Sequence, residues 1–160
     1  MKRIFSLFIA IVLFTMPFTA SAVNDTPSGE IISTTVEILD VGTILETVIY
    51  VENSTASTYA TKTVSGSKTT TGKNEDGEIL WKFTLNGTFT VNTGVSATCT
   101  AASYSTSNLA SGWSLDSAST SKTGNKAKAD FVFKHKVLFV TTQTVEKSLT
   151  LTCSSDGTLS

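Results

Sequence analysis

Apolar and polar residues alternate with a period of two along the middle of the chain. In the run at 79–91 every second position is apolar except Gly87; the apolar set is Ile79, Trp81, Phe83, Leu85, Phe89 and Val91. This period places the set on one face of a half-buried strand, whereas a helix would scatter it around its circumference. Gly87 predicts a bulge or a bend within that strand.

The same alternation predicts further strands toward the C-terminus. Around 126–134 the inward-facing positions are Ala127, Ala129, Phe131 and Phe133. The run at 137–140 is continuously apolar, which is typical of a strand covered on both faces. The last inward face comprises Val145, Leu149, Leu151 and Cys153.

Turn-forming residues separate these runs, at 76–77, 92–94 and 122–126. At 23–60 the period leaves helix and strand both open. Six or seven short strands without a convincing helix predict an all-β fold, an antiparallel sandwich or barrel, and of the two we expect the β-sandwich. The predicted core is Trp81, Phe83, Leu85, Phe89, Trp113, Phe131, Phe133, Leu149 and Leu151.

Residues 1–22 have the pattern of a secretory signal peptide. Lys2 and Arg3 precede an apolar run, and a small-residue A-x-A site ends at Ala22. The apolar run is short for a membrane span, which needs about 20 apolar residues. We therefore expect cleavage between Ala22 and Val23, a secreted, extracellular mature chain, and no membrane span after cleavage.

Charge divides the mature chain into two parts. From Val23 to Thr61 there are six acidic residues and no Lys or Arg, whereas from Lys62 onward ten lysines stand against seven acids. This asymmetry predicts an acidic, partly flexible N-terminal segment at 23–57 before a β-sandwich domain at 58–160. The acidic segment is either a solvated tail or a pro-segment that masks the domain.

Two cysteines, Cys99 and Cys153, predict one inter-sheet disulfide, because an even number in an exported chain indicates pairing. A metal site is the alternative, but no paired spacing such as C-x₂-C supports it. The order Cys99, Trp113, Cys153 suits immunoglobulin-like packing, in which a buried Trp lies against the disulfide. Leu151 stands where that fold has a Tyr, so the sequence favours the packing without the full topology.

Several segments of the second part resemble a known family. They are Ser67–Lys73, Leu80–Asn92, Ser96–Thr100 and Leu151–Ser160. They look like the marks of small secreted β-rich proteins of unknown function from Gram-positive anaerobes of the clostridial type, over roughly Thr58 to Ser160. The resemblance implies export and a β-rich domain. It implies no catalytic residues, because the matching positions are turn and core residues.

The sequence offers little support for catalytic or cofactor chemistry. The mature chain has one histidine, His135, and no local motif places it between a nucleophile and a carboxylate. We expect it to be a packed or rim side chain. Asp116 and Asp130 are not expected to be the carboxylate pair of a glycosidase, because Asp130 shares a strand face with lysines and is a solvated cross-strand partner. The acidic turn at 74–78 lacks the ligand order of a calcium loop. We therefore predict no enzyme activity, no catalytic residues, no cofactor and no metal.

Lysines form the most functional-looking surface. Lys126, Lys128, Lys134 and Lys136 share a parity that places them on the solvent face of a regular strand. They either prevent edge-to-edge aggregation or form a cationic patch for an anionic surface such as a cell-wall polymer, lipid or glycan. Nucleic acid is not expected, because the body is only weakly basic and lacks interleaved exposed aromatics.

Together these observations predict a secreted, non-catalytic module with a binding or surface-structural role. A cell-wall polymer, a glycan or a host-surface protein is the candidate partner. The alternative is a secreted bacteriocin-like or host-directed effector whose acidic N-terminal segment is removable. N-terminal sequencing of the exported protein separates the two, because a start near Val23 supports the module and a start between Thr58 and Lys62 supports the effector.

Overall fold

A computed structural model of the 160-residue chain describes residues 29–39, 42–55 and 61–160. Within these residues the fold is all-β, with eight strands and no helix. The strands are β1 (Glu30–Ile38), β2 (Ile44–Thr55), β3 (Thr61–Lys73), β4 (Ile79–Asn92), β5 (Ser96–Ser107), β6 (Trp113–Thr123), β7 (Lys126–Val137) and β8 (Val140–Thr152). The predicted signal peptide and its cleavage site at Ala22 and Val23 lie outside the described residues.

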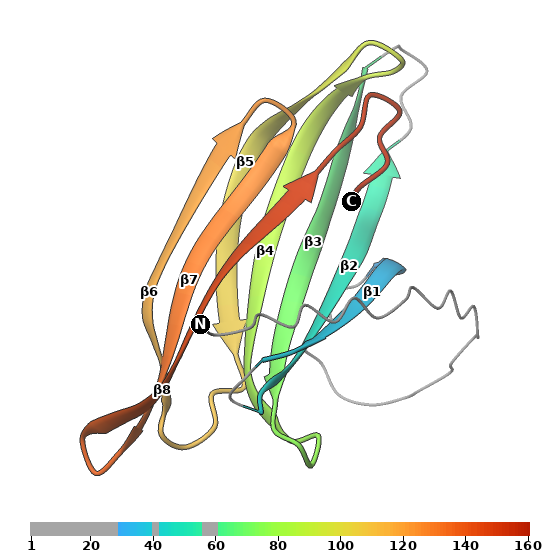
Figure 1. Cartoon of the computed structure of the whole chain (residues 1–160). Helices are drawn as coiled ribbons and strands as arrows, with labels where there is room; N and C mark the ends of the chain where they lie inside the picture. Colours follow the sequence, from blue (N-terminus) through green and yellow to red (C-terminus); the bar gives the residue numbers. More distant parts are fainter. Residues whose placement is uncertain (1–28, 40–41, 56–60) are drawn as a thin grey trace, which may run out of the picture.

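The strands form two antiparallel sheets in simple chain order (Figure 1). Sheet A has the order β1-β2-β3-β4-β5, and sheet B has the order β6-β7-β8. Gly77, Gly94 and Gly124 take positive φ in the β3–β4, β4–β5 and β6–β7 turns, where the sequence predicted turns. The bulge predicted within β4 at Gly87 is not found there, because the β4–β5 register shifts between Thr88 and Phe89 and the extra residue, Thr100, lies on β5.

The two sheets pack face to face around aromatic side chains from β4 and β7. Phe83 stacks on Phe131 with ring centroids 4.0 Å apart, and Trp81 stacks on Phe133 at 4.4 Å. Such ring pairs contribute about 0.5–1.5 kcal/mol each beyond the burial of their area. Every residue of the predicted core is buried. The inward parity read from the sequence is therefore confirmed for these strands.

Sheet A begins earlier in the chain than the sequence predicted. Residues 30–38 and 44–55 form β1 and β2, within the stretch expected to be a partly flexible acidic segment. Leu45 and Ile49 of β2 are 3% and 6% exposed and belong to the core. The acidic charge of this segment did not indicate a flexible tail, because acidic and buried residues alternate along a strand. Glu46, next to Leu45, points to the opposite face of β2. The predicted boundary itself falls in 56–60, outside the described residues.

The predicted packing of Trp113 against the two cysteines is wrong. Trp113 is the first residue of β6. The amides of Cys99 and Cys153 donate to the carbonyl oxygens of Gly124 and Asn125, at 2.7 and 3.0 Å, at the opposite end of β6. In the immunoglobulin fold the chain also passes back and forth between the two sheets, whereas here each sheet is formed by consecutive strands. The order of Cys, Trp and Cys along a sequence does not decide which end of a strand each one occupies.

Both cysteines are buried free thiols, so the predicted disulfide is not shown. The Cys99 Sγ donates to the Ala101 carbonyl at 3.3 Å, and the Cys153 Sγ donates to the Ser154 carbonyl at 3.5 Å. Burial raises the pKa of both thiols above the usual range, and Asp156 and Cys99 raise that of Cys153 further. The amides of the two cysteines bond to consecutive residues of the β6–β7 turn, Gly124 and Asn125, so both cysteines lie beside the same turn. Their raised pKa values keep them protonated and weakly reactive at neutral pH.

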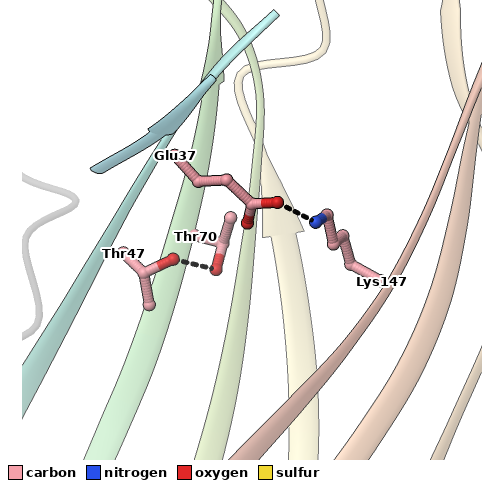
Figure 2. Close-up of polar contacts among 4 residues, drawn as sticks. All are labelled: Glu37, Thr47, Thr70 and Lys147. Atoms are coloured by element: carbon pink, nitrogen blue, oxygen red, sulfur yellow. Dashed lines mark hydrogen bonds and ion pairs between the residues drawn. The ribbon is translucent and has the colours of Figure 1, made fainter. Parts of the chain in front are cut away.

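Polar side chains bridge the two sheets along one side (Figure 2). Lys147 of β8 donates from Nζ to the Glu37 carboxylate of β1 at 2.7 Å. Nearby, the hydroxyls of Thr47 and Thr70 are hydrogen-bonded at 2.9 Å between β2 and β3. The ion pair is partly exposed, and exposed pairs of this kind contribute about 0–1 kcal/mol. The aromatic core therefore dominates the attachment of the two sheets.

Candidate functional site at the tip of the β7–β8 hairpin

The turn between β7 and β8 exposes a cluster of large apolar side chains. Leu138 and Phe139 are 87% and 99% exposed, the highest values among the large apolar residues of the described chain. Val137 and Val140, on either side, are 49% and 65% exposed. The prediction that 137–140 is a strand covered on both faces is therefore wrong. The run forms the tip of a hairpin, and we call Val137–Val140 the apolar tip.

The backbone of the apolar tip is left-handed at both loop residues. Leu138 has a φ of 47° and Phe139 a φ of 70°. Positive φ at both positions of a two-residue loop is the mark of a type I′ turn, which matches the twist of a β-hairpin and strongly favours Asn-Gly. Other L residues incur about 1–2 kcal/mol each in this conformation. A turn that keeps Leu and Phe against this preference indicates a role for their side chains.

The hairpin has its last contacts with the rest of the fold near Lys136. The Lys136 amide donates to the Gly112 carbonyl at 2.8 Å, and the His135 ring lies 5.3 Å from the Trp113 ring. Across the hairpin, His135 Nδ1 and the Thr142 hydroxyl are hydrogen-bonded at 2.8 Å. His135 thus lies at the rim of the core and braces the hairpin base. Beyond this base the hairpin projects away from the neighbouring turns (Figure 1).

The structure separates the four candidate lysines along β7. Lys126 and Lys128 lie at the end next to the β6–β7 turn, whereas Lys134 and Lys136 lie next to the apolar tip. About 20 Å of strand separates Lys128 from Lys134, and the Asp130 carboxylate lies between them. The lysines therefore do not form one continuous patch. Only the second pair adjoins an apolar surface.

The hairpin around the apolar tip is positively charged. Residues 134–144 include two lysines and one histidine and no acidic residue. Lys134 is ion-paired with Asp116 of β6 at 2.8 Å. Lys136 is exposed and has no ion pair within the described chain. The apolar tip is thus bordered by one uncompensated positive charge and one that is shared with a carboxylate.

A cleft of about 410 Å³ lies beside the hairpin base, between Trp113, His135 and the β3–β4 turn. The acidic turn closes on itself, because the Asn74 side-chain amide donates to the Glu78 carboxylate and the Glu78 backbone amide donates to Asn74 Oδ1, both at 2.8 Å. Within the ranges that the structure describes, no group of three His, Cys, Asp or Glu residues is arranged to hold a metal ion.

Sequence reasoning missed the apolar tip because Leu138 and Phe139 are not turn-forming residues. Gly, Asn, Asp and Pro, which normally mark a turn, are absent from 134–144. One signal was present nonetheless. A single strand through 126–152 would greatly exceed the usual length of 3–10 residues, so a turn had to occur near its middle, where the apolar run lies.

No protein-family model matches the chain, and neither a curated protein nor a solved structure matches it. The resemblance to clostridial secreted proteins accordingly stays a prediction. Among the residues described, no helix has the length and apolar character needed to cross a membrane.

Proposed function

We propose that this chain is an exported, non-catalytic β-sandwich module that binds a surface through the apolar tip of its β7–β8 hairpin. The observation that carries the proposal is the exposure of Leu138 and Phe139 in left-handed conformations. Exposed apolar clusters favour aggregation unless a partner covers them. A strained backbone that keeps such a cluster exposed supports selection for contact rather than for folding.

Export is the second element of the proposal, and it rests on the basic, apolar and A-x-A pattern of residues 1–22. In an oxidising compartment we propose that Cys99 and Cys153 form a disulfide. Their amides bond to the neighbouring carbonyls of Gly124 and Asn125, which holds their two strands at the same turn. A bond there would join sheet A to the end of β8 that lies opposite the apolar tip.

The effector alternative, with a removable acidic segment, has weaker support. Removal of everything before residue 58 would take β1 and β2 out of sheet A and leave β3 as an unpaired edge. It would also delete Leu45 and Ile49 from the core. Losing these two buried aliphatic side chains at about 2–5 kcal/mol each would consume most of the stability of a small domain.

A surface-capture experiment tests the proposed function. The secreted protein is incubated with isolated bacterial envelopes and with intact host cells, and the bound fraction is measured. The Leu138→Asn, Phe139→Gly double variant replaces the apolar tip by the preferred type I′ pair and so preserves the fold. We expect this variant to lose capture, while Lys126→Gln, at the far end of the same strand, retains it.

Equal capture of the wild type and the double variant on every surface would contradict the proposed function. Circular dichroism of both variants verifies that the sheets are intact, so that a loss of capture reports the loss of the apolar tip.

A further inference from the structure

We propose that the partner of the apolar tip is the surface of an anionic lipid bilayer, into which Leu138 and Phe139 insert. This inference rests on the proposed function and names the surface that the same site binds. It follows from the shape of the tip, from the charge next to it and from the hydrogen bonding of the hairpin.

The shape of the apolar tip favours a fluid apolar phase over a folded partner. Phe139 is 99% exposed and Leu138 is 87% exposed, at the end of a hairpin that projects from the sheets. A protein partner would need a pocket complementary to both side chains, whereas acyl chains close around a convex tip without any preformed shape. Shallow burial of large apolar side chains in the headgroup boundary is the usual means of interfacial attachment.

The charge next to the tip is complementary to an anionic bilayer. Lys136 directly precedes the apolar tip and has no ion pair within the described chain, whereas Lys134, two residues earlier in the strand, shares its charge with Asp116. Lysines at this level would meet lipid phosphates when the tip is inserted. Glu75 and Asp76 of the β3–β4 turn line a cleft with His135 at the base of the hairpin, and the turn and the hairpin diverge from there toward their tips (Figure 1).

The hydrogen bonding of the hairpin limits the depth of insertion. Val137 and Val140 pair with each other across the turn, so their side of the ladder is satisfied internally. The outer edges of a two-stranded hairpin stay unpaired, and unpaired edges are not tolerated in the hydrocarbon core. Exposed hydroxyls of Thr141, Thr142 and Thr144 follow within one or two pleats and match the polar headgroup level. Insertion should therefore involve the apolar tip alone.

Vesicle binding of the secreted protein tests this inference. Co-sedimentation is measured with vesicles of phosphatidylglycerol and phosphatidylcholine in equal amounts, and with phosphatidylcholine alone. We expect binding to the anionic vesicles that weakens with added salt. Leu138→Asn, Phe139→Gly should reduce the partition coefficient by about tenfold or more. Lys136→Gln should reduce it by about fivefold, and the matched control Lys126→Gln should leave it unchanged.

A tryptophan at the tip reports the insertion directly. Trp81 and Trp113 are 0% and 8% exposed, so a Phe139→Trp variant adds a solvent-exposed fluorophore to two buried ones. Its emission should shift to shorter wavelength on anionic vesicles and be quenched by lipids brominated near the headgroup. The wild type should show neither change, because its two tryptophans stay in the core.

The outcomes separate the bilayer inference from the proposed function. If the double variant loses capture on cells while the wild type fails to bind vesicles, the partner is a protein or a glycan, and the bilayer inference is overturned alone. Vesicle binding that does not depend on the tip, or a tip tryptophan whose emission stays unchanged on bound vesicles, would overturn it as well. Concentration-dependent dimerisation that the double variant abolishes would identify a second copy of the chain as the partner instead.

Discussion

Leu138 and Phe139 combine an unfavourable backbone conformation with side chains that are almost fully exposed. In the core the opposite holds, since Phe83 and Phe131 are buried, stacked and within regular strands. The core residues thus favour the conformation that they adopt, whereas Leu138 and Phe139 disfavour the turn in which they lie. Conflicts of this kind are expected where a residue serves a function other than folding.

Replacing the two tip residues by turn-forming ones should stabilise the protein. Leu138→Asn, Phe139→Gly removes two L residues from left-handed positions and deletes little buried area. Each strained residue incurs about 1–2 kcal/mol, and the greater entropy of Gly in the unfolded chain offsets part of the gain. We therefore expect the free energy of unfolding to rise by about 1–2 kcal/mol. Urea denaturation of the wild type and the double variant measures the difference. A lower unfolding midpoint for the variant would contradict the account of strain.

At the scale of elements, the C-terminal turn at 154–160 attaches the end of β8 to sheet A. Leu159 is 3% exposed and belongs to the core, and Ser160 exchanges two backbone hydrogen bonds with Thr152, at 2.8 and 2.9 Å. From β3, Lys62 donates from Nζ to the Asp156 carbonyl at 2.7 Å. The turn therefore joins the two sheets at the end opposite the apolar tip.

The stability of this turn should depend on pH in the acid range. The Asp156 carboxylate accepts hydrogen bonds from the Ser154 hydroxyl and the Thr158 amide, which lower its pKa from 3.8 to about 2. Because the folded pKa lies below the unfolded one, the stabilisation is complete above pH 3.8 and is lost as the pH falls toward 2. In thermal denaturation, the difference between the wild type and Asp156→Asn should shrink over this window. A constant difference would show that the carboxylate does not act through its charge.

At the scale of the whole molecule, the described residues form two sheets in chain order, which the aromatic core between β4 and β7 holds together. The polar bridge from Glu37 to Lys147 and the C-terminal turn add attachment along the side and at one end. The apolar tip lies at the end of sheet B, beyond these attachments. The proposed binding role requires a contact element held by a rigid scaffold, because rigid elements position a site most precisely.

Oxidation should stabilise the whole molecule. If Cys99 and Cys153 pair on export, the loop between them is closed, and reduction should lower the free energy of unfolding by about 2–4 kcal/mol. The Cys99→Ala, Cys153→Ala variant is the control, because its stability should not respond to reductant. Alkylation of the secreted protein under denaturing, non-reducing conditions tests the premise. Two alkylated thiols per molecule would contradict the proposed disulfide.

Much of the fold could be predicted because its signals are local. Alternation at 79–91 placed Trp81 and Phe83 in the core, and Asp76-Gly77 marked a turn through its tolerance of positive φ. β1 and β2 could not be read in this way, since Ile38, Leu45 and Val48 fit a helical stripe as well as a strand. Their strand conformation depends on pairing between strands, since β2 pairs with β3 and β1 pairs with β2.

The candidate site was accessible only in part. Alternation along the strand grouped Lys134 and Lys136 with Lys126 and Lys128 on one face. In the structure the two pairs lie at opposite ends of β7, with an acidic residue between them, so they do not form one patch. The run at 137–140 has the composition of a buried strand, and composition does not specify whether another element covers it.

The sequence by itself determined the all-β class, the inward faces and three of the turns, because period-two alternation and turn chemistry act between neighbouring residues. Only the tertiary structure decided that Trp113 and the cysteines occupy opposite ends of the molecule and that Leu138 and Phe139 project into solvent. Those placements depend on strand register and on the extent of each sheet. Both are set by contacts between residues far apart in the chain, which no local pattern encodes.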